Sequence, residues 1–358
     1  MKRLLVLIFF FLSSAGAFAQ HLNSFVDYRE YFYIFDHGVS HQQEYQVVQS
    51  HKVGGKCLAY VDNLGKFKVY YDGVVTELER YNIGVYVATE HLLVYKVSQE
   101  LMVFDEGKIK SLVYHPAYFG VGDSLVAYLD RASRYLTVYY KGDIFKIADG
   151  LLAHPAKTMR VGDNIVGFVD DQDKLYLFYR GKIKELIYNP LNFKVSLNTA
   201  AYVDAMSGTF SIFHKGDIYE METFAPTSYK VGDDIVAYVD ESGSFKVFYD
   251  GEMTTISSFK PDFYRVVDDM VIYGENGVFK LVYKAREYTL ENYIPKVYQA
   301  DQATLAYIDQ FGFLQCFFKG ETHTLSNEAV RDINVAGNTV AYKVGLNTNK
   351  VFHNGQIY

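Results

Sequence analysis

Acidic side chains recur at one fixed position of this 358-residue sequence, two residues after a regularly spaced aromatic residue. The set comprises Asp27, Asp62, Asp130, Asp170, Asp204, Asp240 and Asp309, with Glu275 at one further position. Carboxylates gathered on one surface can bind cations or a basic partner. An Asp at the start of a turn can instead accept hydrogen bonds from that turn, and Gly65 follows Asp62 at a suitable spacing. We interpret these acids as structural turn residues and keep an acidic crown as the alternative.

Two further acidic patterns lack the spacing of a known site. Asp123, Asp163 and Asp233 each follow a glycine ahead of an expected strand, and turn geometry accounts for them. The acidic stretch from Asp170 to Asp173 lacks the glycine and the distal glutamate of a calcium-binding loop. We therefore predict no metal site at either position.

The histidines and cysteines give no catalytic or metal-binding signature. There is no H-E-x-x-H pair and no cysteine-rich spacing. We interpret as surface loop residues the histidines His21, His37, His41, His51, His115 and His154. Cys57 and Cys316 replace apolar core positions and are expected to be free, buried thiols. Since G-x-S-x-G and phosphate-binding loops are also absent, the sequence predicts no catalytic residue, no cofactor and no enzyme.

These residues are carried by a repeat of about 35 residues that fills almost the whole chain. Its first aromatic recurs ten times, at Phe25, Tyr60, Tyr95, Tyr128, Phe168, Tyr202, Tyr238, Tyr273, Tyr307 and Tyr342. Each copy contains short apolar runs separated by polar turns, such as Ile235 to Val239 and Phe245 to Tyr249, which predict antiparallel strands. The six prolines share one phase and mark the link between copies, outside the strands.

Two large side chains stand next to each other near the end of each copy, as at Phe248 and Tyr249. Neighbours on a strand point to opposite faces, so both faces of each small sheet need to be covered. Sheets stacked face to face around an axis meet that need, which predicts an all-β fold of the β-propeller type built from ten repeats. The number of blades stays open, with fewer blades, two five-bladed rings or an open β-solenoid as alternatives.

The ends and the charge of the chain suggest its compartment. Residues 1–19 have a basic start, an apolar run and an A-x-A end, as in a secretory signal peptide, so residues 20–358 form the expected single mature domain. No lipidated cysteine and no later membrane span are expected. The mature chain would keep 33 basic and 42 acidic residues after loss of Lys2 and Arg3 from the stated 35, and this negative balance disfavours nucleic acid.

The phrase V-A-Y-V-D-x-x-G-x-F-K-V-F-Y-D-G, ending at Gly251, resembles the WD40-like and TolB-like propeller repeats of exported bacterial proteins. It lacks the Trp-Asp mark of true WD40 units, because the chain has no tryptophan. The signal end and the Tyr-rich, Phe-rich strands also look like exported proteins of Bacteroidota. That resemblance implies a periplasmic protein serving an outer-membrane machine such as the type 9 secretion translocon.

We therefore expect a non-enzymatic, exported module that binds a protein partner and is periplasmic or else secreted. The resemblance implies that this partner is an envelope or outer-membrane complex. The irregular link between the fourth and fifth repeats is the expected partner loop, with Gly150, Leu151, Leu152 and His154. Two alternatives remain. One is a small-ligand or glycan-binding propeller that uses its channel or its aromatic residues, and the other is a cryptic hydrolase that uses rim carboxylates.

Overall fold

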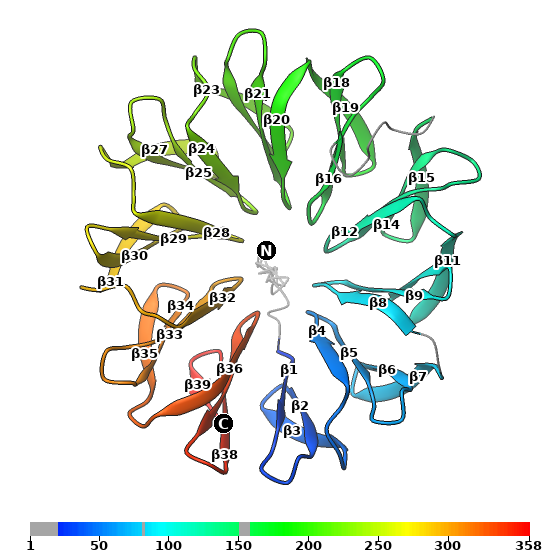
Figure 1. Cartoon of the computed structure of the whole chain (residues 1–358), viewed down its shortest axis with the longest axis vertical. Helices are drawn as coiled ribbons and strands as arrows, with labels where there is room; N and C mark the ends of the chain where they lie inside the picture. Colours follow the sequence, from blue (N-terminus) through cyan, green and yellow to red (C-terminus); the bar gives the residue numbers. More distant parts are fainter. Residues whose placement is uncertain (1–20, 81–82, 150–157) are drawn as a thin grey trace, which may run out of the picture.

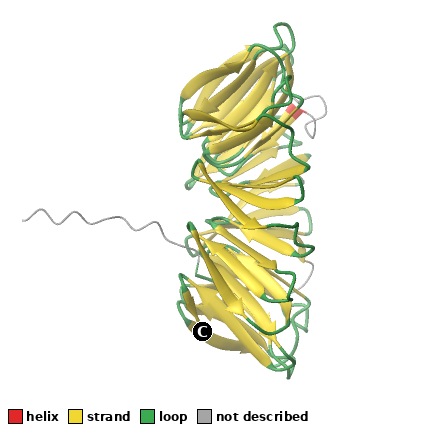
Figure 2. Ribbon diagram, turned by 90° about the vertical axis from the view of Figure 1, so that its left-hand side faces the viewer, coloured by secondary structure: helices red, strands yellow, loops and turns green. Residues whose placement is uncertain are grey.

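The structure is a computed structural model that describes residues 21–80, 83–149 and 158–358. Ten small antiparallel sheets stand radially around a central channel and form a flat ring (Figures 1 and 2). The predicted propeller is confirmed with ten blades, one for each repeat, and the open solenoid is excluded. Within the described residues, no helix is long and apolar enough to cross a membrane.

Each blade is one antiparallel meander, numbered here in chain order, and in blades 2 to 10 its first strand is the innermost (Figure 1). The strands of the first five blades are β1 (Asn23–Val26), β2 (Phe32–Asp36) and β3 (Val39–Glu44); β4 (Ser50–Val53), β5 (Cys57–Val61), β6 (Phe67–Tyr71) and β7 (Val74–Glu79); β8 (Ile83–Ala88), β9 (Leu92–Val97), β10 (Glu100–Asp105) and β11 (Lys108–Tyr114); β12 (Tyr118–Val121), β13 (Leu125–Leu129), β14 (Leu136–Tyr140) and β15 (Asp143–Ala148); β16 (Met159–Val161), β17 (Ile165–Val169), β18 (Lys174–Tyr179) and β19 (Lys182–Tyr188). Those of the last five are β20 (Pro190–Val195), β21 (Thr199–Asp204), β22 (Phe210–His214) and β23 (Asp217–Glu222); β24 (Ser228–Val231), β25 (Ile235–Val239), β26 (Phe245–Tyr249) and β27 (Glu252–Ser257); β28 (Phe263–Val267), β29 (Met270–Glu275), β30 (Val278–Tyr283) and β31 (Arg286–Glu291); β32 (Tyr298–Asp301), β33 (Thr304–Ile308), β34 (Leu314–Phe318) and β35 (Glu321–Ser326); β36 (Val330–Ala336), β37 (Thr339–Val344), β38 (Thr348–His353) and β39 (Gln356–Ile357).

The repeated aromatics form the core between blades. Tyr238 on β25 is fully buried and packs against Phe210 of the preceding blade, with ring centroids 5.2 Å apart. The equivalent pair one blade later, Phe245 and Tyr273, lies at 5.3 Å. Cys57 and Cys316 are buried and free, as predicted. Because each of these aromatics needs the preceding blade to cover it, the blades depend on their neighbours for burial.

Ring closure joins the first and last blades by packing and side-chain hydrogen bonds. The Asn23 amide on β1 donates to the Thr339 hydroxyl on β37 at 2.8 Å and to the Asn334 carbonyl at 3.2 Å. Phe35 packs with Ala341 and Val351 across the same seam. Blade 1 shows three strands within the described residues, and β1, which carries Phe25, matches the second strand of the other blades.

Two details of the sequence-based description change. Pro190 is the first residue of β20 and is paired with Asp204, so the prediction that every proline lies outside the strands is wrong there. The first residue of a strand is one of the few strand positions that tolerate proline. The expected partner loop cannot be described, because Gly150, Leu151, Leu152 and His154 lie outside the described residues.

Successive turns of each meander lie on alternate faces of the ring. Consecutive antiparallel strands reverse direction, so the turn between the first and second strands and the turn between the second and third lie on opposite faces. We call them the inner turns and the rim turns. The inner turns come nearest to the channel because they follow the innermost strands (Figure 1).

Candidate functional site

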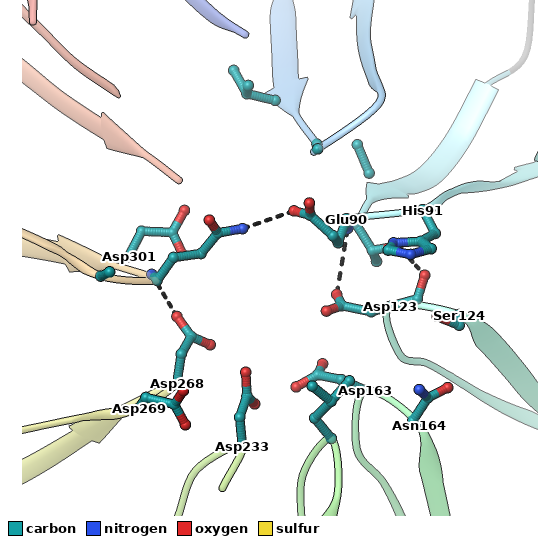
Figure 3. A pocket seen from close by; sticks show the side chains of 18 of the residues that line it. Glu90, His91, Asp123, Ser124, Asp163, Asn164, Asp233, Asp268, Asp269 and Asp301 are labelled. Atoms are coloured by element: carbon teal, nitrogen blue, oxygen red, sulfur yellow. Dashed lines mark hydrogen bonds between the residues drawn. The ribbon is translucent and has the colours of Figure 1, made fainter. Parts of the chain in front are cut away.

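Six carboxylates from six blades surround one mouth of the channel. Figure 3 shows their side chains around an open centre, each contributed by an inner turn or the end of an inner strand. We call them the channel acids, and they are Glu90, Asp123, Asp163, Asp233, Asp268 and Asp301. Their side chains are half-buried and line a cavity of about 650 Å³.

Glycine allows the inner turns to approach one another closely. A Cβ atom on Gly232 would lie 2.0 Å from the Asp268 carbonyl oxygen of the next blade, and one on Gly122 would lie 2.0 Å from the Gly162 carbonyl. The backbone N–H of Asp233 donates to that same Asp268 carbonyl at 3.0 Å. The Val-Gly-Asp sequence therefore joins adjacent blades through their backbones and sets the following carboxylate beside the channel.

Polar groups link the carboxylates around the ring and across it. Blade 6 has no acid at this position, but its Ser196 hydroxyl lies 3.0 Å from Asp233 Oδ1 and 3.3 Å from Asp163 Oδ2. Gln302 follows β32 in blade 9, and its side-chain amide donates to Glu90 Oε2 of blade 3 at 2.8 Å, which joins two blades on opposite sides of the mouth. These contacts hold the acids in place without neutralising them.

Positive charge is scarce at the site. Among the described residues that line the cavity, seven are acidic, counting Asp269 with the channel acids, and Lys284 is the single lysine or arginine. None of the ion pairs in the described part of the chain includes a channel acid. The mouth is consequently a concentrated source of negative potential.

The pKa values of five channel acids are raised above those of free carboxyl groups. Burial is the largest cause and raises the pKa of Glu90 to about 7, with the charges of Asp301 and Asp268 adding to it. Burial and neighbouring carboxylates likewise raise the pKa values of Asp123, Asp163 and Asp268. For Asp233, burial and then the charge of Asp268 raise the pKa. Repulsion of this kind makes a cationic ligand favourable, because it would relieve the clustered charge.

The spacing of the channel acids does not suit one small, directly chelated ion. Across residues 21–80, 83–149 and 158–358, the one group of three metal-ligating side chains with all ligand atoms within 4.8 Å is His21, Asp36 and His37, which lies elsewhere. Calcium takes six to eight oxygen ligands at about 2.3–2.6 Å, which requires closer oxygens. The arrangement suits a larger cationic group with several hydrogen-bond donors, such as an ammonium or guanidinium side chain.

The rim acids expected from the sequence occupy a different place. Asp27, Asp62, Asp130, Asp170, Asp204, Asp240 and Asp309 lie at the turns between the second and third strands of their blades. Each accepts hydrogen bonds from its own turn within four residues. Asp62, for example, accepts from the N–H groups of Leu64 and Lys66 at 2.9 Å each. These contacts are those of a structural turn residue.

Sequence reasoning assigned three of the channel acids to turn geometry and missed the other three. A signal was present, because the acid stands five residues before the repeated aromatic in five cases, as at Asp233 and Tyr238, and six before it at Asp301 and Tyr307. Only Asp123, Asp163 and Asp233 follow a glycine, so a search for Gly-Asp finds half of the set. His115, interpreted as a loop residue, follows β11, and its ring nitrogen Nδ1 lies 2.7 Å from Gln99 Oε1.

Comparison with known proteins bears on the fold. A family model described as a 10-bladed beta propeller domain matches residues 16–358. No curated protein matches the chain. The chain is similar to the computationally designed Ika8 protein, with 14% identity over 76% of this chain and 96% of that one and a TM-score of 0.36. The CRINKLY WD40 ectodomain of the Arabidopsis thaliana receptor kinase ACR4 gives 8% identity, 68% and 98% coverage and a TM-score of 0.36.

TM-scores this low do not support an assignment. The family assignment therefore rests on the family model alone. It includes nearly the whole chain, and the structure shows the same number of blades. The chain belongs to the family of ten-bladed β-propeller domains.

Proposed function

We propose that this protein is a non-enzymatic, exported binding module whose channel acids receive a cationic segment of a partner protein. The observation that carries the proposal is the convergence of six carboxylates on one channel mouth with no ion pair to any of them in the described residues. A lysine or arginine side chain entering the cavity would gain charge-assisted hydrogen bonds and relieve the repulsion among the acids.

The cavity also bears on the alternatives. Tyr283 is the one aromatic residue among the described residues that line it, whereas Tyr238, Tyr273 and their equivalents are buried between blades. A sugar stacking on aromatic faces has little surface to use there. A hydrolase would need an acid–base pair, and the Asp163 and Asp233 carboxyls are hydrogen-bonded to each other. We assign them to binding because both are also linked to Ser196 within the ring.

The envelope partner remains a more specific proposal. The resemblance to exported Bacteroidota propellers supports a periplasmic partner, with an outer-membrane machine such as the type 9 secretion translocon as the favoured case. An acidic channel mouth is compatible with docking on a basic loop of such a machine. Cross-linked pull-down from envelope extracts, with the protein as bait, tests this proposal, which fails if intact envelope complexes are present and none is recovered.

Binding of hexalysine measured by fluorescence anisotropy at pH 8 and low salt tests the general function. The ring-neutral variant carries Asp163→Asn, Asp233→Asn and Asp268→Asn. We expect its affinity for hexalysine to fall by about tenfold or more, because three carboxyl groups that would ionise and pair with the bound lysines are removed. Lowering the pH of the wild-type protein to about 5.5 should weaken binding too, since the raised pKa values of Glu90 and Asp268 leave these two groups largely protonated there.

A matched control carries the same change in net charge on exposed acids, with Asp171→Asn, Glu241→Gln and Glu252→Gln. This variant should bind hexalysine within about twofold of wild type, because its changes lie outside the cavity lining. Equal loss of affinity in both variants, or no binding by the wild-type protein, would show that the channel acids do not form a binding site.

A further inference from the structure

A second cluster lies at the seam between the first and last blades. His21 lies two residues before β1, Asp36 ends β2, and His37 begins the hairpin turn to β3. Asp36 Oδ1 lies 2.6 Å from His37 Nδ1 and 3.3 Å from His21 Nε2. The two imidazole rings stack with centroids 3.5 Å apart. Two nitrogen ligands and one oxygen ligand thus share a small volume.

The separations match those of ligands on one metal ion. Zinc binds imidazole nitrogen and carboxylate oxygen at about 2.0–2.2 Å, and a tetrahedral arrangement then places ligand atoms roughly 3.3 Å apart. The three ligand atoms of the cluster all lie within 4.8 Å of one another, and no other group within the described residues meets that criterion. Only small side-chain adjustments are needed to bring all three onto one ion.

A neighbouring blade orients the carboxylate. The Tyr70 hydroxyl of blade 2 donates to Asp36 Oδ2 at 2.6 Å, which leaves Oδ1 directed at the two histidines. Hydrogen bonds of this kind commonly fix the ligands of metal sites. On the other side of the seam, His353 and Tyr358 of blade 10 pack against Phe35, the residue before Asp36. The cluster is therefore built from the segment ahead of β1 and the turn between β2 and β3, with the last blade beside it.

We propose that His21, Asp36 and His37 bind one divalent transition-metal ion, with neutral imidazole nitrogens and a carboxylate oxygen as ligands. Ligands of this type suit zinc and its neighbours in the first transition series. The fourth position stays open to water, because the His37 side chain is 70% exposed and lies at the surface. The bound ion would fasten the segment ahead of β1 to the hairpin of blade 1 and so strengthen the ring where it closes.

Zinc titration of the full mature chain, expressed without a polyhistidine tag and stripped by chelation, tests this site. Calorimetry should show one Zn²⁺ per chain, and thermal unfolding should shift upward by several degrees with excess Zn²⁺. Co²⁺ in place of Zn²⁺ should give the intense visible absorption of a four-coordinate site. The variants Asp36→Asn and His37→Ala should lose about tenfold or more in affinity and lose the zinc-dependent thermal shift.

The control His41→Ala removes an exposed histidine of β3 outside the cluster and should keep wild-type zinc binding. Because Asp36→Asn also removes a partner of Tyr70, the comparison uses the zinc-dependent shift of each variant and not its absolute stability. The proposal is overturned if the wild-type chain takes up no stoichiometric Zn²⁺, or if Asp36→Asn and His37→Ala bind it as tightly as His41→Ala.

Discussion

The rim acids and the channel acids occupy turns on opposite faces of the ring, and the two kinds of surroundings act on ionisation in opposite directions. The pKa is lowered for four rim acids, Asp27, Asp62, Asp130 and Asp240, and raised for five channel acids, Glu90, Asp123, Asp163, Asp233 and Asp268. At the rim, burial opposes ionisation of Asp240, but the Lys246 ammonium and the hydroxyl and N–H groups of its turn lower its pKa to about 2. In the channel, burial and neighbouring carboxylates raise the pKa of Asp233. Aspartate thus stabilises the fold at the rim, whereas at the channel mouth of the same repeat its ionisation is opposed by burial and by neighbouring carboxylates.

The difference comes from what each turn provides. A rim turn has its own backbone donors pointing at the carboxylate, and Lys246 lies 2.9 Å from Asp240. The inner turns direct their N–H groups largely to the next blade, as Asp233 N does to the Asp268 carbonyl. Asp123, Asp268 and Asp301 each accept one N–H from a neighbouring blade, but no lysine or arginine pairs with a channel acid in the described residues. A cationic ligand would therefore favour their ionised form. Four predictions test this comparison.

The largest effect is expected from Gly232→Ala at an inner turn. The new Cβ would meet the Asp268 carbonyl at 2.0 Å, so adjacent blades would have to separate. We expect a loss of about 3 kcal/mol in the free energy of unfolding, measured by urea denaturation. Gly243→Ala at a rim turn is the matched change, because Gly243 has open space and needs only a positive φ of 90°. It should cost about 1 kcal/mol, and equal costs would contradict the distinction.

Asp240→Asn should be the next most damaging change. It leaves the Lys246 ammonium without one of its carboxylate partners and weakens the hydrogen bonds from Ser242 and Ser244. We expect a loss of about 2 kcal/mol near neutral pH. Because the folded pKa is depressed, this contribution is present above the unfolded pKa and disappears as the pH falls towards 2. Asp171→Asn serves as the neutral control, because Asp171 is exposed and directly follows a rim acid, Asp170, in another blade.

Asp233→Asn should have the opposite sign. The folded chain binds more protons than the unfolded chain between the two pKa values, so this carboxyl destabilises the fold as the pH rises through that window. We expect the variant to be more stable than wild type by at least about 1–2 kcal/mol at pH 8, with the gain shrinking as the pH falls towards the unfolded pKa of about 3.9. Urea unfolding at several pH values measures it. A loss of stability at pH 8 would mean that the channel environment is not repulsive.

The smallest effect concerns salt. Added NaCl screens repulsion between half-buried carboxylates only in part, so raising it from about 0.05 to 0.5 M should stabilise the wild-type chain at pH 8 by roughly 0.5 kcal/mol relative to the ring-neutral variant. The variant with Asp171→Asn, Glu241→Gln and Glu252→Gln should respond as wild type does. Identical salt responses in all three proteins would place the repulsion outside the channel.

Much of the fold was predictable because the same pattern of apolar residues and turns recurs in every repeat. The spacing of Tyr238, Tyr273 and their equivalents, with adjacent large residues at Phe248 and Tyr249, required sheets covered on both faces. The turn role of Asp62 was also accessible, since an Asp with a glycine three residues later describes a local hydrogen-bond pattern. The number of blades at which the ring closes could not be predicted from the sequence, because it depends on the angle between neighbouring sheets.

The sequence by itself determined the strands, the rim turns and the aromatic contacts between blades, since these follow from neighbours within one or two repeats. Only the tertiary structure decided that Glu90 and Gln302, 212 residues apart, face each other across a channel. It likewise brought His21 to Asp36 and placed Asn23 beside Thr339. Such proximity arises because the ring closes. Closure depends on the rotation from each blade to the next, added over all ten blades, and the sequence of one repeat does not specify that total.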